Sequence, residues 1–208
     1  MPLPFPRPSK IVCVGRNYAA HARELGNEVP AAPLLFLKPP SALIGPGEAI
    51  VLPPASAQVE FEGEIGVVVG ARLRRASAAE AERGIGGVVP ANDVTARDLQ
   101  KSDAQWTRAK GFDTFCPVGP SVVAGGDWRA LEVVTRVNGV ERQRGRATQM
   151  LFDIPTLLAF ISGVMTLEPG DLVLTGTPAG VGPLAPGDVV EVEIPGVGLL
   201  SNPVVAAS

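Results

Sequence analysis

The sequence predicts an α+β fold that is mainly β. Three observations carry this prediction: nine short β-rich runs, only three or four helical patterns, and no regular alternation between the two. A doubly wound parallel sheet requires that alternation, so a large, curved antiparallel or mixed sheet fits better. The 208 residues suit one domain, 1–208, with residues 1–9 as an N-terminal extension.

The expected strands are short and bounded by turn residues. Asn138-Gly139 is the two-residue signal for a type I′ hairpin and joins one run to a polar strand at 140–144. The run 59–69 turns apolar on both faces near its end, so we expect it to enter the interior. The expected strands are residues 10–14, 34–37, 49–52, 59–69, 87–94, 131–137, 171–174, 189–194 and 198–205.

Helices are expected at residues 17–25, 77–83, 96–106 and 154–165. Asn17 can cap the first helix, and Gly26 can end it in a left-handed conformation. In the last helix, Pro155 suits the first turn and apolar residues recur at helical spacing.

Composition excludes several classes of function. A net charge of −3 with 19% charged residues offers no basic surface for nucleic acid. No apolar stretch reaches the roughly 18 residues of a membrane span, and no signal peptide is evident. Cys13 and Cys116 both lie in apolar runs, which favours reduced core thiols. We therefore expect a cytoplasmic protein that binds neither nucleic acid nor membrane.

Three glutamates alternate along the run 59–69, at Glu60, Glu62 and Glu64. On a strand, this period places the three side chains on one face, about 6.6 Å apart. The pattern alone favours a half-exposed strand whose glutamates face water. The apolar residues that follow argue instead for an interior position, where carboxylates are costly unless they are paired or metal-bound.

Two strand carboxylates and one distant Asp or Glu suffice for Mg²⁺, which takes oxygen ligands and keeps positions for water or substrate. Asp93 is the best third ligand, because it stands where an apolar strand ends in polar residues and a helix begins. An Asp in that position is, taken alone, more often a helix cap or a turn residue.

Six short motifs follow one another along the chain. They are Gly15-Arg16-Asn17-Tyr18 with His21 and Glu24, Phe36-Leu37-Lys38-Pro39, Glu62-x-Glu64-Ile65-Gly66, Asn92-Asp93-Val94-Thr95-Ala96-Arg97-Asp98, Lys110-Gly111-Phe112 and Thr175-Gly176-Thr177-Pro178. Together they resemble the fumarylacetoacetate hydrolase family. They are most similar to its small single-domain acylpyruvase and oxaloacetate decarboxylase members, over about residues 10–205.

The resemblance implies a mixed β-sandwich roll, a homodimer and a bound Mg²⁺ or Mn²⁺ ion. The metal ligands would be Glu62, Glu64 and Asp93, with Glu60 as a neighbour. Phe61 stands where related sequences often carry a histidine, which removes a possible imidazole next to the metal site.

Lys110, as an isolated lysine, would ordinarily be a surface charge. Three carboxylates and one divalent cation sum to −1, however, so a lysine beside them could neutralise the site and stabilise an enolate. The resemblance places Lys110 there, and it implies that Thr177 helps to hold the substrate carboxylate. The glycine-rich loop around Thr177 lacks the lysine and the spacing of a P-loop, which argues against nucleotide binding.

His21 is the only histidine, and Glu24 follows at i+3 on the same face of the first expected helix. A lone histidine on a helix is more often an ordinary surface residue, but an imidazole paired with a carboxylate is also the arrangement of a general base. The resemblance places the pair on a segment that orders over the substrate. Arg16 and Lys38 are candidate partners for substrate carboxylates.

The predicted function is that of a metal-dependent hydrolase or lyase that cleaves a carbon–carbon bond in acylpyruvate-type 2-oxo acids through an enolate. Acylpyruvate or fumarylpyruvate hydrolysis and oxaloacetate decarboxylation are both compatible with the motifs. An alternative is a 2-hydroxyhepta-2,4-diene-1,7-dioate isomerase or a decarboxylase of aromatic-acid breakdown. A metal-stabilised module that binds 2-oxo acids without turnover is the alternative of another class.

Overall fold

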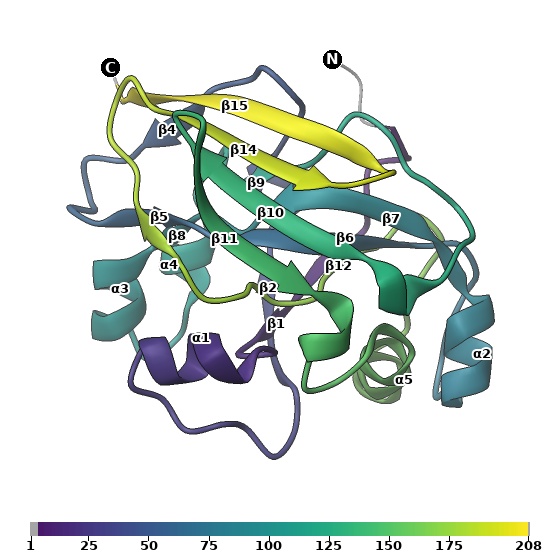
Figure 1. The fold of residues 1–208 in the computed structure, drawn as a ribbon. Helices are drawn as coiled ribbons and strands as arrows, with labels where there is room; N and C mark the ends of the chain where they lie inside the picture. The colour runs from purple at the N-terminus through teal and green to yellow at the C-terminus, as the bar shows by residue number, and fades with distance from the viewer. Residues whose placement is uncertain (1–3, 208) are drawn as a thin grey trace.

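Two five-stranded sheets dominate the computed structural model, which describes residues 4–207 (Figure 1). The first sheet has the order β2 (Leu34–Lys38), β1 (Ile11–Gly15), β12 (Leu172–Leu174), β6 (Gly63–Val69) and β7 (Ile85–Asn92). The second has the order β11 (Val140–Arg146), β10 (Glu132–Val137), β14 (Val189–Ile194), β15 (Gly198–Ala206) and β4 (Ile50–Leu52).

Two smaller sheets complete the strand structure. One joins β13 (Gly182–Pro183), β5 (Val59–Phe61) and β8 (Thr95–Ala96), and the other joins β3 (Leu43–Ile44) and β9 (Cys116–Pro117). Pairing is mixed: β1 runs parallel to β12 and antiparallel to β2, and β15 runs parallel to β4. The predicted α+β fold with a mixed, mainly β architecture is confirmed.

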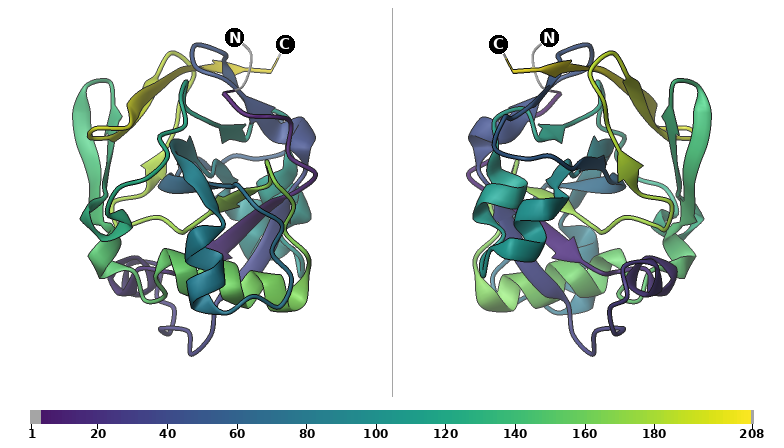
Figure 2. Two further views of the ribbon diagram at one scale, coloured as in Figure 1. Left: turned by 90° about the vertical axis from the view of Figure 1, so that its right-hand side faces the viewer. Right: turned by 90° about the vertical axis from the view of Figure 1, so that its left-hand side faces the viewer.

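Five α-helices are short and peripheral. They are α1 (Ala19–Glu24), α2 (Ala78–Arg83), α3 (Arg97–Ser102), α4 (Thr107–Gly111) and α5 (Ile154–Val164), with 3₁₀ turns at Pro40–Ala42, Trp128–Ala130 and Ala147–Gln149. Helices α1, α2 and α5 gather at one end of the molecule (Figure 2). Within residues 4–207, none of the helices has the length and apolar character needed to cross a membrane.

The main core lies between the two large sheets and against α5. Side chains of β1, β6 and β12 meet those of β10, β14 and β15, and Leu157, Leu158 and Ile161 of α5 are fully buried among them. Helix α5 begins where predicted, with Asp153 accepting a hydrogen bond from Thr156 N at 3.0 Å. All seven residues of β6 are buried, as expected for a strand that enters the interior.

Two local predictions agree with the structure. Asn138 and Gly139 both have positive φ, 52° and 74°, and Val137 pairs with Val140, as a type I′ hairpin requires. Cys13 and Cys116 are free and buried, and burial raises the pKa of Cys116 to about 12. Both cysteines are therefore unreactive core thiols.

Three element boundaries differ from the predictions. The residue before the first helix is Tyr18 and not Asn17. The Asn17 side chain instead accepts a hydrogen bond from Phe152 N and donates to Phe152 O and to Thr175 O. The expected helix 96–106 ends early, at Ser102, because Asp103 is extended (ψ 140°), and α4 begins only at Thr107. The expected strand 59–69 is interrupted at Glu62, where β5 and β6 diverge to different partner strands.

Asp171 ties the N-terminal segment to the first sheet. Its buried carboxylate accepts hydrogen bonds from Ser9 N and Oγ, from Lys10 N and Nζ, and from Glu168 N. Burial by itself raises the pKa of Asp171, but the hydrogen bonds from Glu168, Lys10 and Ser9 outweigh that effect and hold this pKa below its ordinary value.

Asp171→Asn should lower the free energy of unfolding at pH 7 by on the order of 2 kcal/mol, because charge-assisted hydrogen bonds are lost. A depressed pKa stabilises the fold above the unfolded-state value of about 3.9 and loses that contribution as pH falls. The difference between the variant and the parent should therefore shrink below about pH 4 in urea unfolding. Asp113→Asn, which changes an exposed carboxylate, is the control, and a pH-independent difference for Asp171→Asn would contradict the assignment.

Candidate active site

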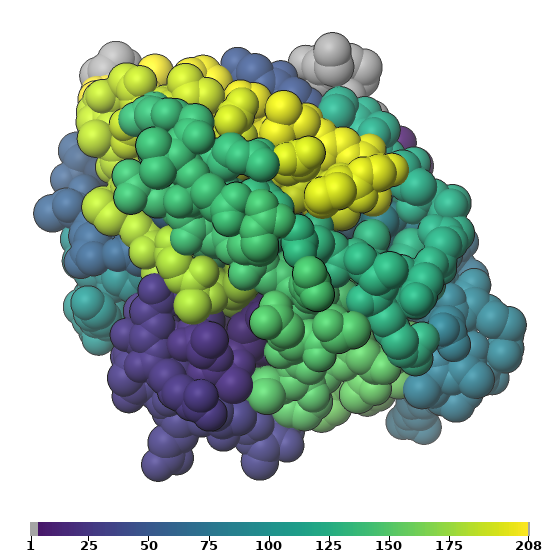
Figure 3. All heavy atoms as spheres, viewed as in Figure 1, coloured from purple at the N-terminus to yellow at the C-terminus, as the bar shows by residue number. Residues whose placement is uncertain are grey.

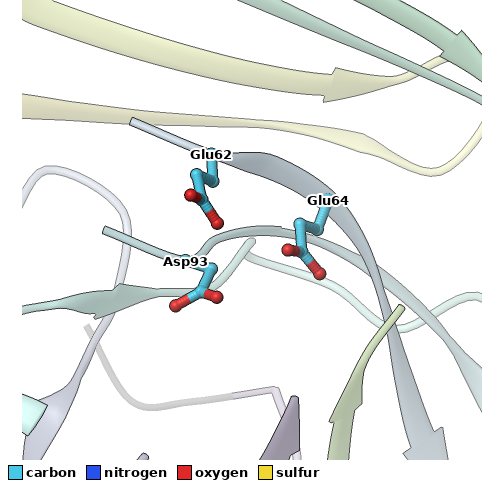
Figure 4. A group of neighbouring side chains, drawn as sticks. All are labelled: Glu62, Glu64 and Asp93. Carbon is cyan, nitrogen blue, oxygen red and sulfur yellow. The ribbon is translucent and has the colours of Figure 1, made fainter. Parts of the chain in front are cut away.

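Three carboxylates converge where the strands of the first sheet end. Glu62 lies between β5 and β6, Glu64 lies on β6, and Asp93 lies between β7 and β8. The antiparallel register pairs Gly63 with Asn92, which places Asp93 opposite Glu62, and Asp93 N donates to Glu62 O at 2.8 Å. One carboxylate oxygen of each residue lies within 4.8 Å of the others, and the three side chains extend to the same side (Figure 4).

All three carboxylates are buried, with exposed fractions of 5% for Glu62, 2% for Glu64 and 1% for Asp93. Glu60 is also buried, so the glutamates do not form a solvated strand face. Its carboxylate accepts hydrogen bonds from Gln58 Nε2 and Arg97 Nε, and it is not one of the three converging carboxylates. The expected position of Glu60 as a neighbour of the cluster matches this geometry.

Two buried cations hold Glu62. Arg97 Nη2 donates to its Oε1 at 2.6 Å, and Lys110 Nζ donates to its Oε2 at 2.9 Å and to Asp93 Oδ2 at 2.7 Å. Burial raises the pKa of Glu62, but the charges of Lys110 and Arg97 outweigh it and set this pKa far below the ordinary range. Lys110 is thus part of the site and not an exposed surface charge.

Glu64 has the opposite electrostatic environment. Burial and the negative charges of Asp93 and Glu62 raise its pKa well above the ordinary value, although Gly176 N donates to its Oε2 at 2.6 Å. Asp93 has a cation at each oxygen, since Lys38 Nζ lies 2.8 Å from Oδ1 and Lys110 Nζ lies 2.7 Å from Oδ2, whereas no ion pair within residues 4–207 involves Glu64. The cluster therefore has unsatisfied negative charge.

A divalent cation fits this donor set. All candidate ligand atoms are carboxylate oxygens, which suit Mg²⁺ or Mn²⁺. The four buried carboxylates, Glu60 included, and the three buried cations leave a net charge of −1 when all are ionised. A divalent ion would relieve the repulsion that raises the pKa of Glu64.

The position of Lys38 contradicts the prediction that this lysine binds a substrate carboxylate. Its side chain is fully buried, and Nζ donates to Val94 O at 2.9 Å and to Lys110 O at 2.7 Å while it pairs with Asp93. These three oxygens occupy the ammonium group. Lys38 supports Asp93 and the end of α4 from behind the carboxylate cluster.

A cavity of about 450 Å³ opens above the carboxylates. Glu62, Glu64 and Lys110 line it, and so do Arg16 and the pair His21 and Glu24. Its remaining walls are Val14, Gly15, Leu25, Asn27, Arg97, Gln100, Lys101, Trp106 and Thr177. The structure thus brings together seven of the nine predicted site residues around one cavity. Asp93 is bonded to Lys110 of this lining, and Lys38 is paired with Asp93.

The His21 imidazole is oriented by Glu24. Its Nδ1 lies 3.2 Å from Glu24 Oε2, and the Glu24 carboxylate also accepts from Gly180 N at 2.9 and 3.2 Å. Helix α1 accordingly packs against the segment that follows β12, coloured yellow-green in Figure 3. Arg16 has a strained positive φ of 62° at the cavity wall, and its guanidinium has no ion pair within the described chain.

Thr177 lines the cavity, but its hydroxyl group already has protein partners. Its Oγ1 donates to Gly63 O at 2.9 Å and accepts from Gln143 Nε2 at 2.7 Å. The hydroxyl proton is therefore not available to a substrate carboxylate. The backbone N–H of Thr177, which has no hydrogen-bond partner within residues 4–207, is the donor that remains.

Sequence reasoning missed three polar residues of the site. Arg97 lies inside one of the six motifs, and Gln100 follows it by one helical turn and accepts from Arg97 Nη1. That i+3 spacing was a signal that could have found Gln100. Gln143 lies on the polar strand β11, and no local pattern distinguishes it from its exposed neighbours.

Comparisons with known proteins point to one family. The family described as "Fumarylacetoacetate (FAA) hydrolase C-terminal" matches residues 10–205. The Mycobacterium tuberculosis protein Rv2993c is 53% identical over 200 residues, 95% of this chain and 76% of that protein. The mitochondrial oxaloacetate tautomerase FAHD2A of Bos taurus is 43% identical over 214 residues, 97% of this chain and 68% of that protein.

Solved structures show the same fold. The 2-hydroxyhepta-2,4-diene-1,7-dioate isomerase of Mycobacterium marinum superposes with a TM-score of 0.91 at 50% identity, over 99% of this chain and 77% of that one. The fumarylpyruvate hydrolase of Pseudomonas aeruginosa, in complex with Mn²⁺ and pyruvate, has a TM-score of 0.91 at 32% identity, over 98% of this chain and 91% of that one. This chain belongs to the fumarylacetoacetate hydrolase family.

Proposed function

We propose that this protein is a metal-dependent enzyme that forms the enolate of a 2-oxo acid and cleaves a carbon–carbon bond beside it. The observation that carries the proposal is a buried oxygen-ligand cluster, Glu62, Glu64 and Asp93, beneath a cavity that also presents a histidine–glutamate pair. Family members are enzymes, and relatives of this chain include a fumarylpyruvate hydrolase, a 2-hydroxyhepta-2,4-diene-1,7-dioate isomerase and an oxaloacetate tautomerase.

Glu62, Glu64 and Asp93 would hold Mg²⁺ or Mn²⁺, which supplies a Lewis acid for the carboxylate and keto oxygens of the substrate. Lys110 keeps a positive charge beside two of these ligands, because Asp93 and Glu62 raise its pKa even though burial acts to lower it. With a substrate bound at the metal, that charge would lie close to the developing enolate and would stabilise the transition state more than the bound substrate.

His21 is the proposed base for hydrolysis. With Nδ1–H directed at Glu24, the ring leaves Nε2 to accept a proton from water. The water oxygen then bonds to the distal carbonyl carbon of an acylpyruvate, the carbon–carbon bond breaks, and the electron pair stays on the pyruvate enolate. Protonation of that enolate gives pyruvate, and the acyl group leaves as a carboxylic acid.

Two cations favour a substrate with a second negative charge. Arg16 and Lys101 line the cavity, and neither forms an ion pair within residues 4–207. Fumarylpyruvate, oxaloacetate and 2-hydroxyhepta-2,4-diene-1,7-dioate all carry two carboxylates. The isomerase or decarboxylase of aromatic-acid breakdown therefore stays the second candidate, and the homodimer stays a prediction from the family.

The proposal is tested by incubating the purified protein and Mg²⁺ or Mn²⁺ with acylpyruvates, fumarylpyruvate, oxaloacetate and unsaturated 2-oxo diacids. We expect metal-dependent release of pyruvate from at least one of them, measured in an assay coupled to lactate dehydrogenase. We also expect diacids to be the preferred substrates. Isomerisation without pyruvate release would favour the second candidate. Binding of pyruvate without turnover of any substrate would indicate a binding module.

Mg²⁺ or Mn²⁺ should raise the melting temperature of the parent protein, because a ligand that binds only the native state adds stability. At 100 times its dissociation constant the gain is about 2.7 kcal/mol, or about 5–10 °C for a chain of this size. Glu64→Gln should largely remove the increase, while Glu82→Gln on exposed α2 keeps it. An equal increase in Glu64→Gln would exclude Glu64 from the ligand set.

His21→Ala and Glu24→Ala should separate two reactions, because hydrolysis needs an activated water and decarboxylation needs only electron withdrawal. We expect acylpyruvate hydrolysis to fall by roughly 10²–10⁴-fold, with a much smaller loss of any oxaloacetate decarboxylation. Steady-state kinetics on both substrates measures this, with Arg23→Ala on the exposed side of α1 as the control. An equal loss of both activities would contradict the role of His21 as the base.

A further inference from the structure

We infer that Gln143, on β11 of the second sheet, is a positioning residue that sets the geometry of the two metal-binding glutamates through the peptide between them. The inference rests on the metal site of the proposed function. It assigns to the second sheet, which contributes none of the three carboxylates, a direct part in building the site.

The contacts form a closed ring around Gly63. Gly63 N donates to Gln143 Oε1 at 2.9 Å, Gln143 Nε2 donates to Thr177 Oγ1 at 2.7 Å, and Thr177 Oγ1 donates to Gly63 O at 2.9 Å. The second Nε2 hydrogen reaches Pro178 O at 2.7 Å. A backbone N–H must face the amide oxygen, so the orientation of the Gln143 amide is fixed.

Gly63 needs this support because of its own conformational freedom. It stands directly between Glu62 and Glu64, so a rotation at Gly63 changes the separation of the two carboxylates. A glycine is required there, since a Cβ would lie 1.9 Å from Thr135 Oγ1. Glycine also has the most permissive backbone, because it has no side chain that limits φ and ψ. Hydrogen bonds to its N–H and C=O groups restrict the backbone conformation instead.

The same amide holds the loop after β12 in place. Two close approaches show how tightly this loop packs on β11: a Cβ at Gly145 would lie 2.6 Å from Pro178 Cβ, and one at Gly180 would lie 2.1 Å from Arg142 O. The loop in turn donates Gly176 N to Glu64 and Gly180 N to Glu24. Loss of the Gln143 amide therefore loosens Glu64 in two ways, through the neighbouring Gly63 peptide and through the loop whose Gly176 N binds its carboxylate.

Thr135 provides a matched control. It pairs directly with Gln143 across the β10–β11 ladder, is fully buried and contacts the same Gly63. Its Oγ1, however, makes no hydrogen bond within the described chain. Thr135→Val keeps the shape and removes a hydroxyl that holds nothing, whereas Gln143→Met keeps the approximate shape and removes all contacts of the amide.

Isothermal titration of the purified proteins with Mn²⁺ tests the inference. We expect Gln143→Met to weaken Mn²⁺ binding by about 10–100-fold, the range seen when residues that orient metal ligands are replaced. Thr135→Val should bind Mn²⁺ within about twofold of the parent. The melting temperature in EDTA and the far-ultraviolet circular dichroism report separately on the fold, and Gln143→Asn, which keeps an amide that is one carbon too short, serves if Gln143→Met does not fold.

The outcomes are distinct. Weaker Mn²⁺ binding in Gln143→Met or Gln143→Asn, with Thr135→Val unchanged, supports the inference. Parent-like Mn²⁺ affinity in a folded Gln143 variant overturns the inference and leaves the proposed function intact. An equal loss of affinity in Thr135→Val overturns it as well, because general packing would then account for both. A parent protein that binds no Mn²⁺ overturns the metal-dependent function and this inference together.

Discussion

The buried ion cluster at the end of β6 is the constraint on which the rest of the site depends. Four carboxylates are more than nine-tenths buried there, and a buried carboxylate is tolerated only when it is paired. Arg97 bridges Glu60 and Glu62, and Lys110 bridges Glu62 and Asp93. Lys38 pairs with the other oxygen of Asp93, so within residues 4–207 Glu64 is the carboxylate of the cluster without a cation partner.

The two lysines of the cluster have different roles because they lie at different positions. Lys110 lines the cavity, whereas Lys38 is paired with Asp93 and is not part of the cavity lining. Both ammonium groups also lie near aromatic rings, Lys110 over Phe36 at 4.9 Å and Lys38 over Phe115 at 5.8 Å. The rings supply a weakly attractive apolar environment that replaces water around the two cations.

Local sequence patterns predicted the parts of this architecture that depend on neighbouring residues. The hairpin at Asn138-Gly139, helix α5 and the interior course of β6 follow from turn chemistry, capping and hydrophobic pattern. The break at Glu62 was not predictable, because it arises where β5 and β6 pair with different strands. Asn17 illustrates the same limit, since its amide serves a distant carbonyl at Thr175 instead of the adjacent helix.

The part of the site that sequence could not reveal is held by contacts between residues far apart in the chain. Gly63 bonds Gln143, 80 residues away, and Thr177, 114 residues away, while Glu64 bonds Gly176 at a separation of 112. These partners meet only after the two large sheets have packed. The carboxylates are encoded in two short motifs, but their mutual geometry depends on the packing of the assembled sandwich. Binding of the proposed metal ion would therefore be thermodynamically coupled to sheet packing.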